Sequence, residues 1–315
     1  MHKTKRAAVV LTALMTSACA MRAQTKPTTM KPLVETSLNL EPVQTKRTVQ
    51  KRSEKKQIPK KPQKRNVGEI LADLKDNNKR FNAMYELGEL DFNSMDEKYL
   101  DKVKRDVLDT IKFDSEVLAP GIAVLGKLAD PYLVSELAKY SLNKNDNVRR
   151  QVAKALGNIP TDDSILILID LIGDRRPTVE RAAIDSLVKI GSSSSRHLVA
   201  VVANGNLDRQ YAAVEALSMI GPDAIPYVTV LLGHPDNKVV YHAVTVLGNI
   251  GDKSATDALH GIMSHSDNNV RGTAANALRK IGDQSSIGVL MPIAKNDSSD
   301  FVRAAAKYAI DALSQ

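Results

Sequence analysis

The side chains that most often carry out chemistry in proteins, those of His and Cys, are few and scattered in this chain of 315 residues. The six histidines are His2, His197, His234, His242, His260 and His265. Only His260 and His265 lie close together on one predicted helix. Their spacing of five does not place two imidazoles on one helix face, as the spacing of four in a zinc motif does. We therefore expect no metal site.

Other catalytic patterns are also missing from the sequence. It contains neither a GxSxG nucleophile elbow nor a P-loop. Asp162 and Asp163, and Asp297 with Asp300, lie in predicted turns, where helix capping is the ordinary role of Asp. The sequence predicts a protein that is not an enzyme, with no catalytic residue and no cofactor.

The first twenty residues have the order of a secretory signal, which is basic, then apolar, then small. The basic residues are Lys3, Lys5 and Arg6, the apolar stretch is Ala7–Leu14, and the small residues are Ser17, Ala18 and Ala20. We expect residues 1–18 to be a signal peptide and the protein to be exported.

Cys19 is the only cysteine in the chain. The run Thr16-Ser17-Ala18-Cys19 resembles a bacterial lipobox, in which the Cys is diacylated and becomes the mature N-terminus. Families of this kind usually have Leu, Val or Ile where Thr16 stands. The resemblance favours a membrane-anchored lipoprotein, periplasmic or at the cell surface. The alternative is cleavage after Ala20, which would give a secreted or soluble periplasmic protein. Neither form can contain an internal disulfide.

The charge of +8 is unevenly distributed along the chain. Residues 1–66 hold 16 Lys/Arg and three acids, a net charge of +13, whereas residues 67–315 hold 28 Lys/Arg and 33 acids, a net charge of −5. Residues 19–66 have too few apolar groups to fold, so they are expected to form a disordered basic tether. This tether is either a solvated spacer or, through residues 46–65, an adhesive for anionic lipid headgroups or wall polymer. Because the protein is expected to be exported, nucleic acid is not an expected partner.

A repeat dominates the rest of the sequence. Its anchors recur with sequence separations of 31, 31, 30, 30, 31 and 32, at Leu125, Leu156, Leu187, Leu217, Leu247, Leu278 and Ile310. A period of this length is typical of stacked helical hairpins, in which each unit must cover the apolar side of its neighbour. The product is an elongated superhelix with a long concave face, a shape that predicts binding.

Each unit reads as two helices. In the unit that begins at Val148, apolar residues follow at offsets of 4, 7, 8 and 11, which lie on one helix face. Asp146 and Asn147 are expected to cap this helix, and Pro160 to stop it. Later units end the first helix at Gly191, Gly221, Gly251 and Gly282. Second helices are predicted over Ser164–Ile172, Arg196–Ala203, Ala224–Leu232, Ala255–Ser264 and Ser286–Ala294.

These units resemble the short HEAT-like repeat family over residues 114–315, about six and a half units. The resemblance is carried by Asp146-Asn147-Val148-Arg149 with Ala155-Leu156-Gly157, by Asn268-Asn269-Val270-Arg271 with Ala277-Leu278, and by Asp300-Phe301-Val302-Arg303. It implies an all-α fold, a right-handed α-solenoid. It also implies a ladder of Asp and Arg between units, which the middle repeats depart from because Glu180, Gln210 and Val240 occupy the Arg position.

The two ends of the repeat region differ from its middle. Val67–Leu74, Phe81–Leu90 and Lys98–Phe113 carry apolar residues at helical spacing but off the repeat period, so residues 67–113 are expected to form a helical N-terminal cap. At the other end, no helix follows to cover Phe301 and Tyr308. That face is either wet or meets another chain. Beyond the signal segment, no uninterrupted apolar run reaches the roughly 18–20 residues of a membrane span.

The enzymes known in this family do not match the chain. Deoxyhypusine hydroxylase holds iron with His-Glu pairs, and this sequence has no His-Glu dipeptide. The bilin lyases have no clear counterpart in an exported chain with one thiol. The DNA glycosylases need a basic concave face and aromatic residues, whereas the repeat region is acidic and the chain has no Trp.

The sequence therefore predicts a noncatalytic scaffold at the cell envelope that docks a protein partner on its concave face. The resemblance implies that the second helices line this face, which makes large or polar residues there the candidate contacts. These candidates are Arg196, His197, Tyr227, His260 and Met291. The alternative is an envelope-surface binding module in which the basic tail grips anionic lipid or polymer and the repeats act as a spacer.

Overall fold

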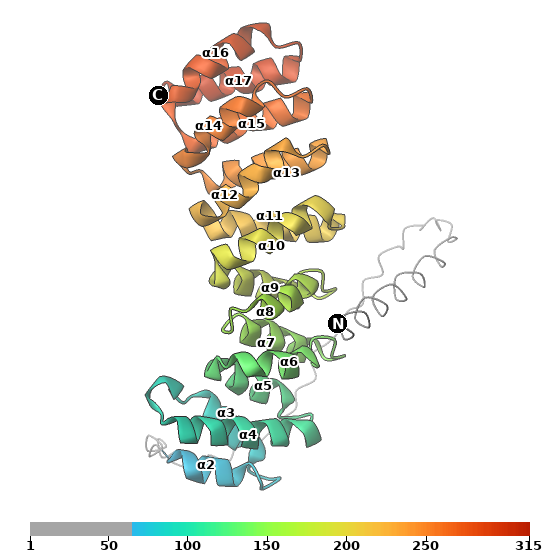
Figure 1. Cartoon of the computed structure of the whole chain (residues 1–315), viewed down its shortest axis with the longest axis vertical. Helices are drawn as coiled ribbons and strands as arrows, with labels where there is room; N and C mark the ends of the chain where they lie inside the picture. The colour runs from blue at the N-terminus through green and yellow to red at the C-terminus, as the bar shows by residue number, and fades with distance from the viewer. Residues whose placement is uncertain (1–64) are drawn as a thin grey trace, which may run out of the picture. The chain divides into compact units, whose positions relative to one another are not determined.

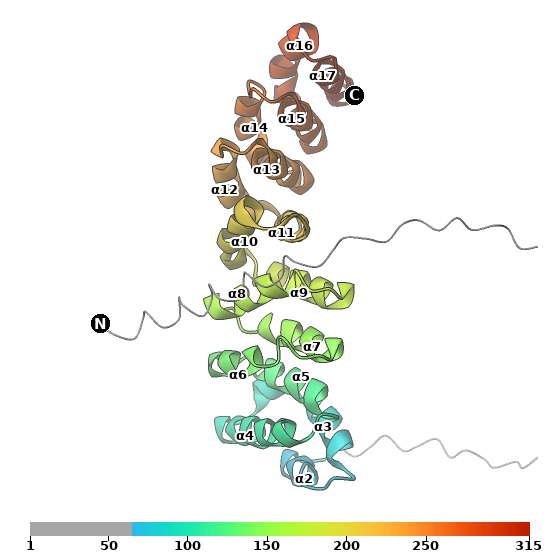
Figure 2. The same cartoon turned by 90° about the vertical axis from the view of Figure 1, so that its right-hand side faces the viewer.

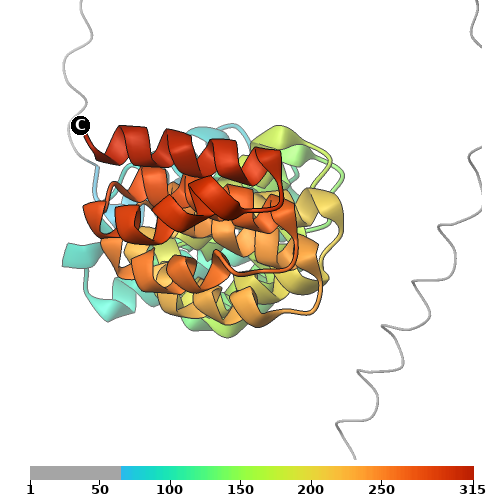
Figure 3. The same cartoon turned by 90° about the horizontal axis from the view of Figure 1, so that it is seen from above.

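A computed structural model describes residues 65–315. In this part of the chain the residues form helices and turns, without β-strands, and the helices are stacked one on another (Figure 1). Seen from above, successive hairpins overlie one another (Figure 3). The predicted all-α solenoid of helical hairpins is confirmed. The predicted signal peptide, Cys19 and residues 19–64 of the predicted tether lie outside the described residues.

The stack begins with three α-helices at the predicted places. These are α2 (Val67–Asp73), α3 (Arg80–Gly88) and α4 (Glu97–Phe113), with the short 3-10 turn η1 (Phe92–Ser94) between α3 and α4. The apolar stripe of α4 is buried, and two ion pairs hold this region in place. Arg80 on α3 contacts Asp114 at 3.0 Å, and Lys104 on α4 contacts Asp130 at 2.8 Å.

The first helix of each repeat carries the anchor residue of the sequence period. These first helices are α5 (Leu118–Leu128), α7 (Asp146–Leu156), α9 (Pro177–Ile190), α11 (Leu207–Ile220), α13 (Asn237–Ile250), α15 (Asn268–Ile281) and α17 (Asp300–Leu313). Every Leu anchor has a relative exposure of 0%. Burying one such side chain contributes about 1.5–3 kcal/mol, so the repeat period is also the period of the core.

The helix ends follow the sequence in most units. Gly191, Gly221, Gly251 and Gly282 all have positive φ, between 71° and 81°, which confirms them as the residues that end the first helices. The capping prediction for α7 is wrong by one residue. Asn145 is the N-cap and accepts a hydrogen bond from the Asn147 amide, because α7 already begins at Asp146.

The second helices are shorter and less regular. They are α6 (Val134–Ala138), α8 (Asp162–Leu171), α10 (Ser192–Asn204), α12 (Ile225–Val228), α14 (Thr256–Ile262) and α16 (Ile287–Asn296). The 3-10 turns η2 (Pro131–Leu133), η5 (Lys253–Ala255) and η6 (Gln284–Ser286) lead into α6, α14 and α16.

The continuous helix predicted over Ala224–Leu232 is not formed. α12 has only four residues and lies between the 3-10 turns η3 (Gly221–Ala224) and η4 (Thr229–Gly233). Pro222 and Pro226 in this stretch have no backbone N–H to donate, and Gly favours other conformations, so a regular α-helix is not maintained.

The two rows of helices pack to different extents. Successive first helices make extensive contact, most of all in the α13–α15 and α15–α17 pairs, whereas successive second helices touch little. A stack with one tighter row bends toward that row. Figure 2 shows the bend in the C-terminal units, with α13, α15 and α17 on its inner side. The expectation that second helices line the concave side is therefore wrong for these units.

The tight packing of the first helices is caused by small residues. A Cβ atom built on Gly126 would lie 2.5 Å from the Cα of Ala155, and one built on Gly248 would lie 2.9 Å from the Cα of Ala277. Both glycines directly follow the Leu anchor of their unit. Successive second helices make fewer contacts with one another.

One described segment, Leu207–Gly233, has the length and mean hydropathy, 1.3, of a membrane span. It was not expected from the sequence because charged residues interrupt its apolar run. In the structure this segment is α11, η3, α12 and η4, which change direction at Gly221 and pack between the neighbouring units. It is a helical hairpin of the stack rather than one continuous helix.

Candidate interaction surface

One stripe of each first helix from α7 to α17 faces away from the core. It consists of three positions in each unit: six residues before the anchor, two residues before it and two residues after it. We refer to these positions as the first-helix face. They are Arg150, Lys154, Asn158, Arg181, Asp185, Lys189, Tyr211, Glu215, Met219, Tyr241, Thr245, Asn249, Gly272, Asn276, Lys280, Ala304, Tyr308 and Ala312. All but the covered Gly272 are partly or fully exposed.

Side chains connect this face from one unit to the next. Lys189 donates to Asn158, and Lys280 donates to Asn249 at 2.9 Å, so the same Lys–Asn pair occurs twice. Near the middle, Arg181 pairs with Glu215 at 2.7 Å. These contacts link the face across the α7–α9, α9–α11 and α13–α15 pairs.

A groove of about 330 Å³ crosses α13, α15 and α17 on this face. Gly248, Ala277 and Thr273 are among its lining residues, with Tyr241 and Phe301 as the two aromatic ones. The ring of Phe301 occupies the space that a side chain at Gly272 would need, since a Cβ there would lie 2.1 Å from Phe301 Cε1. Tyr241 and Phe301 are 41% and 51% exposed, so the groove presents two aromatic rings to solvent beside the polar side chains of Thr245, Asn276 and Lys280.

His242 is a buried titratable group at the edge of this surface. It is 6% exposed and lies between Tyr211 and Tyr241, with ring centroids 5.6 and 5.7 Å away in edge-on geometry. Burial lowers the pKa of His242, and the negative charge of Asp236 only partly offsets this. The imidazole is therefore neutral at pH 7 and acts as a packing residue between α11 and α13.

Acidification is expected to weaken the α11–α13 contact. A His whose pKa is lower in the folded chain takes up a proton on unfolding. The neutral imidazole therefore stabilises the folded chain fully above the unfolded pKa of about 6.5, and this stabilisation is lost as pH falls below it. Melting temperatures measured between pH 7.5 and 5.5 should fall in the natural chain and fall less in His242→Gln. Equal pH dependence in the two proteins would contradict this role.

The ladder of Asp and Arg is present on both sides of the middle repeats. Arg149 contacts both carboxylate oxygens of Asp174, at 2.6 and 2.8 Å, and Arg271 contacts both oxygens of Asp297, each at 2.8 Å. All four side chains are nearly buried. Each Arg also donates to carbonyls of the turn before its own helix. A rung of the ladder therefore joins two successive turns.

The middle units have lost the ladder, as their sequences predicted. Glu180, Gln210 and Val240 stand where the Arg would be. Burial raises the pKa of Glu180, and the nearby Glu215 and Asp208 add to this effect. The glycine after the anchor is also replaced here, by Val188 and Ser218. Contacts of α11 with α9 and α13 are accordingly fewer than those at either end.

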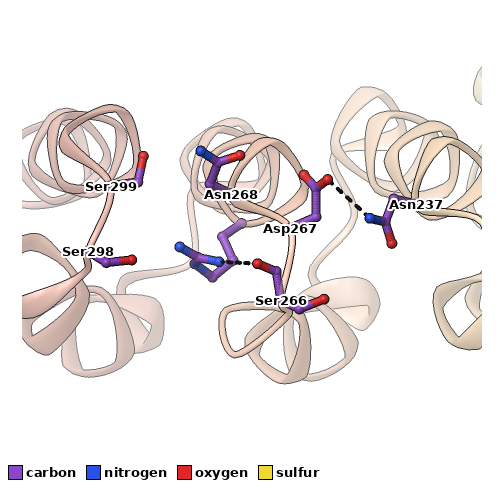
Figure 4. Close-up of a pocket in the computed structure, with 7 residues that line it drawn as sticks. Asn237, Ser266, Asp267, Asn268, Ser298 and Ser299 are labelled. Atoms are coloured by element: carbon purple, nitrogen blue, oxygen red, sulfur yellow. Dashed lines mark hydrogen bonds between the residues drawn. The ribbon is translucent and has the colours of Figure 1, made fainter.

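A hollow of about 570 Å³ lies at the edge of the stack where α13, α15 and α17 begin. Figure 4 shows its polar lining, with Asn237 donating to Asp267 at 3.1 Å and Arg271 donating to the Ser266 carbonyl at 3.0 Å. Asp267 also caps α15 by accepting from two backbone amides. These polar groups already form hydrogen bonds within the turns, so the hollow is part of the turn structure.

The structure places the residues predicted to contact a partner in the row of second helices. Arg196 and His197 lie on α10, Tyr227 on α12, His260 on α14 and Met291 on α16. Two of them come together, since Arg196 and His197 line a groove of about 380 Å³ between α8 and α10.

Local contacts hold several of these side chains. Arg196 pairs with Asp162, and His260 contacts Ser286 at 2.9 Å, whereas Met291 is 61% exposed. The structure does not gather the five residues into one site. No group of three or more His, Cys, Asp or Glu side chains suited to a metal occurs among residues 65–315.

Sequence reasoning missed the first-helix face. A signal for it was present, because the same three positions recur around every anchor and are polar or aromatic in most units. The small residue after the anchor, Gly126, Gly157 or Gly248, also marks three first helices that lie close to the next first helix.

Comparison with known proteins agrees with this architecture. The sequence matches the family of HEAT repeats over residues 105–174, 131–218 and 225–311. No curated protein matches the sequence.

Similar solved structures include human deoxyhypusine hydroxylase in complex with glycerol (18% identity, TM-score 0.36, covering 79% of this chain and 96% of that chain). An archaeal HEAT-like repeats protein from Thermococcus onnurineus is also similar (14%, 0.34, 67% and 97%). A third is a designed armadillo repeat protein in complex with the peptide (KR)4 (17%, 0.33, 69% and 100%).

Proposed function

The chain belongs to the HEAT-repeat family, and from this premise we propose that it is a noncatalytic scaffold that docks a protein partner on its first-helix face. One observation carries the proposal. On six successive first helices the same stripe faces solvent at every position but Gly272. In the C-terminal units this stripe lies on the inner side of the bend. A stack of repeats with such a face offers one extended binding surface.

The exposed aromatic residues support this choice of face. Tyr211, Tyr241 and Tyr308 belong to it, Phe301 lies beside it, and all four are between 41% and 59% exposed. Large exposed apolar groups that gather on one surface mark interaction sites, and Tyr is enriched among the residues that contribute most to binding. The second-helix row carries large exposed side chains as well, such as Leu166, Val230 and Met291, so the two rows must be compared by experiment.

The test compares the two rows of helices directly. Partners are captured by crosslinking in intact cells that produce either the natural chain, Tyr241→Ala/Phe301→Ala, or a second-helix variant with Ala at the five residues first predicted as contacts. We expect at least a tenfold loss of the captured protein, about 1.4 kcal/mol, for the first-helix variant only. Circular dichroism controls for folding. Loss in the second-helix variant alone would reject the first-helix face.

Export and lipid attachment are a separate part of the proposal. They are supported by the basic and apolar order of the first twenty residues and by Cys19 at the end of the apolar stretch. Mass spectrometry of the mature N-terminus should find a diacylated Cys19, and Cys19→Ala should move the protein from the membrane fraction to the soluble fraction. A mature chain that begins at Met21 would show ordinary cleavage instead.

The charge distribution favours one alternative function, a module whose basic tail grips anionic lipid or wall polymer. A net charge of +13 before residue 67 against −5 after it supports this idea. Deleting residues 24–66 while keeping Cys19 separates the two functions. Under the scaffold proposal, partner capture survives the deletion. Under the alternative, envelope retention is lost on deletion and is weakened by salt in the full chain.

A further inference from the structure

The charge of the first-helix face is opposite to that of the region that carries it. The face has five Lys/Arg and two acids, a net charge of +3, although residues 67–315 have a net charge of −5. The cations are Arg150 and Lys154 on α7, Arg181 and Lys189 on α9, and Lys280 on α15. The face therefore has a net positive charge, although the stack as a whole is acidic.

Most of these cations have no carboxylate partner among the described residues. Lys189 and Lys280 donate to Asn side chains, and Arg150 donates to Asn147 at 2.7 Å. Lys154 is exposed and has no hydrogen bond or ion pair with another described residue. Only Arg181 pairs with acids, Asp185 and Glu215. The face as it stands has uncompensated positive charge.

Most cations of the face lie apart from the groove along the stack. Four of the five cations lie on α7 and α9, whereas the groove with Tyr241 and Phe301 crosses α13, α15 and α17, with the fifth cation, Lys280, in its lining. Three helix steps separate α7 from α13, roughly 24–30 Å at 8–10 Å per packed helix, which an extended chain covers with about eight residues.

From this arrangement we propose that the first-helix face binds an extended acidic peptide segment whose large apolar side chain enters the groove about eight residues from its acidic cluster. The inference rests on the proposed scaffold function and adds the chemistry of the partner. Carboxylates of the segment pair with Lys154 and Lys189, and the aromatic walls of the groove hold the apolar side chain. The Thr245, Thr273 and Asn276 side chains that line the groove can bond to its backbone.

A nucleic acid would also be anionic, but the surface fits it less well. Asp185 and Glu215 interrupt the cations, and the net charge of −5 over residues 67–315 would repel a polyanion. Affinity for nucleic acid comes mainly from neutralising many phosphates at once. A peptide needs only a few cations opposite its few carboxylates, so this face can neutralise its charge.

The experiment selects random 16-residue peptides on phage against the purified full chain and measures synthetic winners by fluorescence anisotropy. We expect enrichment of peptides with Asp or Glu at one end and an aromatic or Leu residue at the other. Lys154→Glu/Lys189→Glu should weaken their binding at least tenfold, and so should Tyr241→Ala. The charge-matched control Lys253→Glu/Lys295→Glu, exposed and away from the face, should change binding less than twofold. Added salt should weaken binding in the natural chain.

Three results would overturn the inference. Winners that lack acidic residues but are lost in Tyr241→Ala would refute the acidic partner and leave the scaffold function intact. An absence of winners, or winners that bind both the Tyr241 and Lys variants normally, would refute the inference and the choice of face together. Binding of a labelled 20-nucleotide single-stranded DNA as tightly as the best peptide would assign the face to nucleic acid. Circular dichroism of each variant shows that it is folded.

Discussion

Asp297→Ala is expected to lower the free energy of unfolding of the C-terminal units by about 3–5 kcal/mol, the usual cost of removing one partner of a buried ion pair. Asp297 accepts from the Nε and Nη2 atoms of Arg271 and from the Ser299 amide. Its side chain is 5% exposed and that of Arg271 is 11% exposed. The variant leaves the guanidinium buried without its counter-charge, and it disconnects two turns.

Urea denaturation, with hydrogen exchange of the α15–α17 amides to locate the change, measures this loss. Asp300→Ala is the matched control, because Asp300 is 91% exposed and a surface pair such as its contact with Arg303 contributes about 0–1 kcal/mol. Similar losses in the two variants would show that the buried rung contributes no more than a surface pair.

The same pair makes a pH prediction. The Arg271 guanidinium holds the pKa of Asp297 below its ordinary value. A carboxyl with a lowered folded pKa contributes stability that is present above the unfolded pKa, about 3.9, and is lost as pH falls through the folded pKa. The natural chain should therefore lose this stabilisation in the window below about pH 4, and Asp297→Ala should show a smaller loss there.

Gly248→Ala is expected to destabilise the protein by about 1–3 kcal/mol, although the same change usually stabilises a helix. The added Cβ would lie 2.7 Å from the Cβ and 2.9 Å from the Cα of Ala277. A backbone atom cannot move aside by changing a rotamer, so α13 and α15 must separate. That separation also widens the row of first helices that forms the proposed binding surface.

Gly261→Ala provides the control with opposite sign. Gly261 lies in α14, and a Cβ there meets nothing within 4 Å. This substitution should stabilise by about 0.5–1 kcal/mol, because Ala loses less backbone entropy than Gly in a helix. Thermal unfolding of the two variants should therefore shift in opposite directions. A stabilising effect of Gly248→Ala would disprove the close contact between α13 and α15.

Most of the fold could be predicted from the sequence because its determinants are local. A Leu that recurs once in each repeat, with apolar neighbours at helical spacing, defines the buried stripe of each first helix. Glycines with positive φ end those helices at the predicted positions. The loss of the ladder in the middle repeats could also be predicted from the sequence, since Glu180, Gln210 and Val240 cannot replace a buried Arg. The two 3-10 turns on either side of α12 were not predicted, because the regular apolar pattern of this stretch indicated one continuous helix despite its two prolines.

The candidate surface could not be predicted in the same way. The five residues chosen first, among them Arg196 and Met291, share the second helices, but the structure spreads those helices apart. Tyr241 and Phe301 belong to repeats that are not consecutive in the sequence, and they meet at one groove only because α13, α15 and α17 are stacked. Such a groove depends on three helices at once.

By itself the sequence determined the repeat, the helices, their caps and the inner stripe that each helix buries, because these follow from side chains that are close together along the chain. Only the tertiary structure decided which row of helices packs more tightly and therefore which face lies inside the bend. Curvature arises from small differences in approach between the helices of successive repeats, such as Gly248 against Ala277, summed over the stack. The curvature therefore cannot be predicted from the sequence of any single repeat.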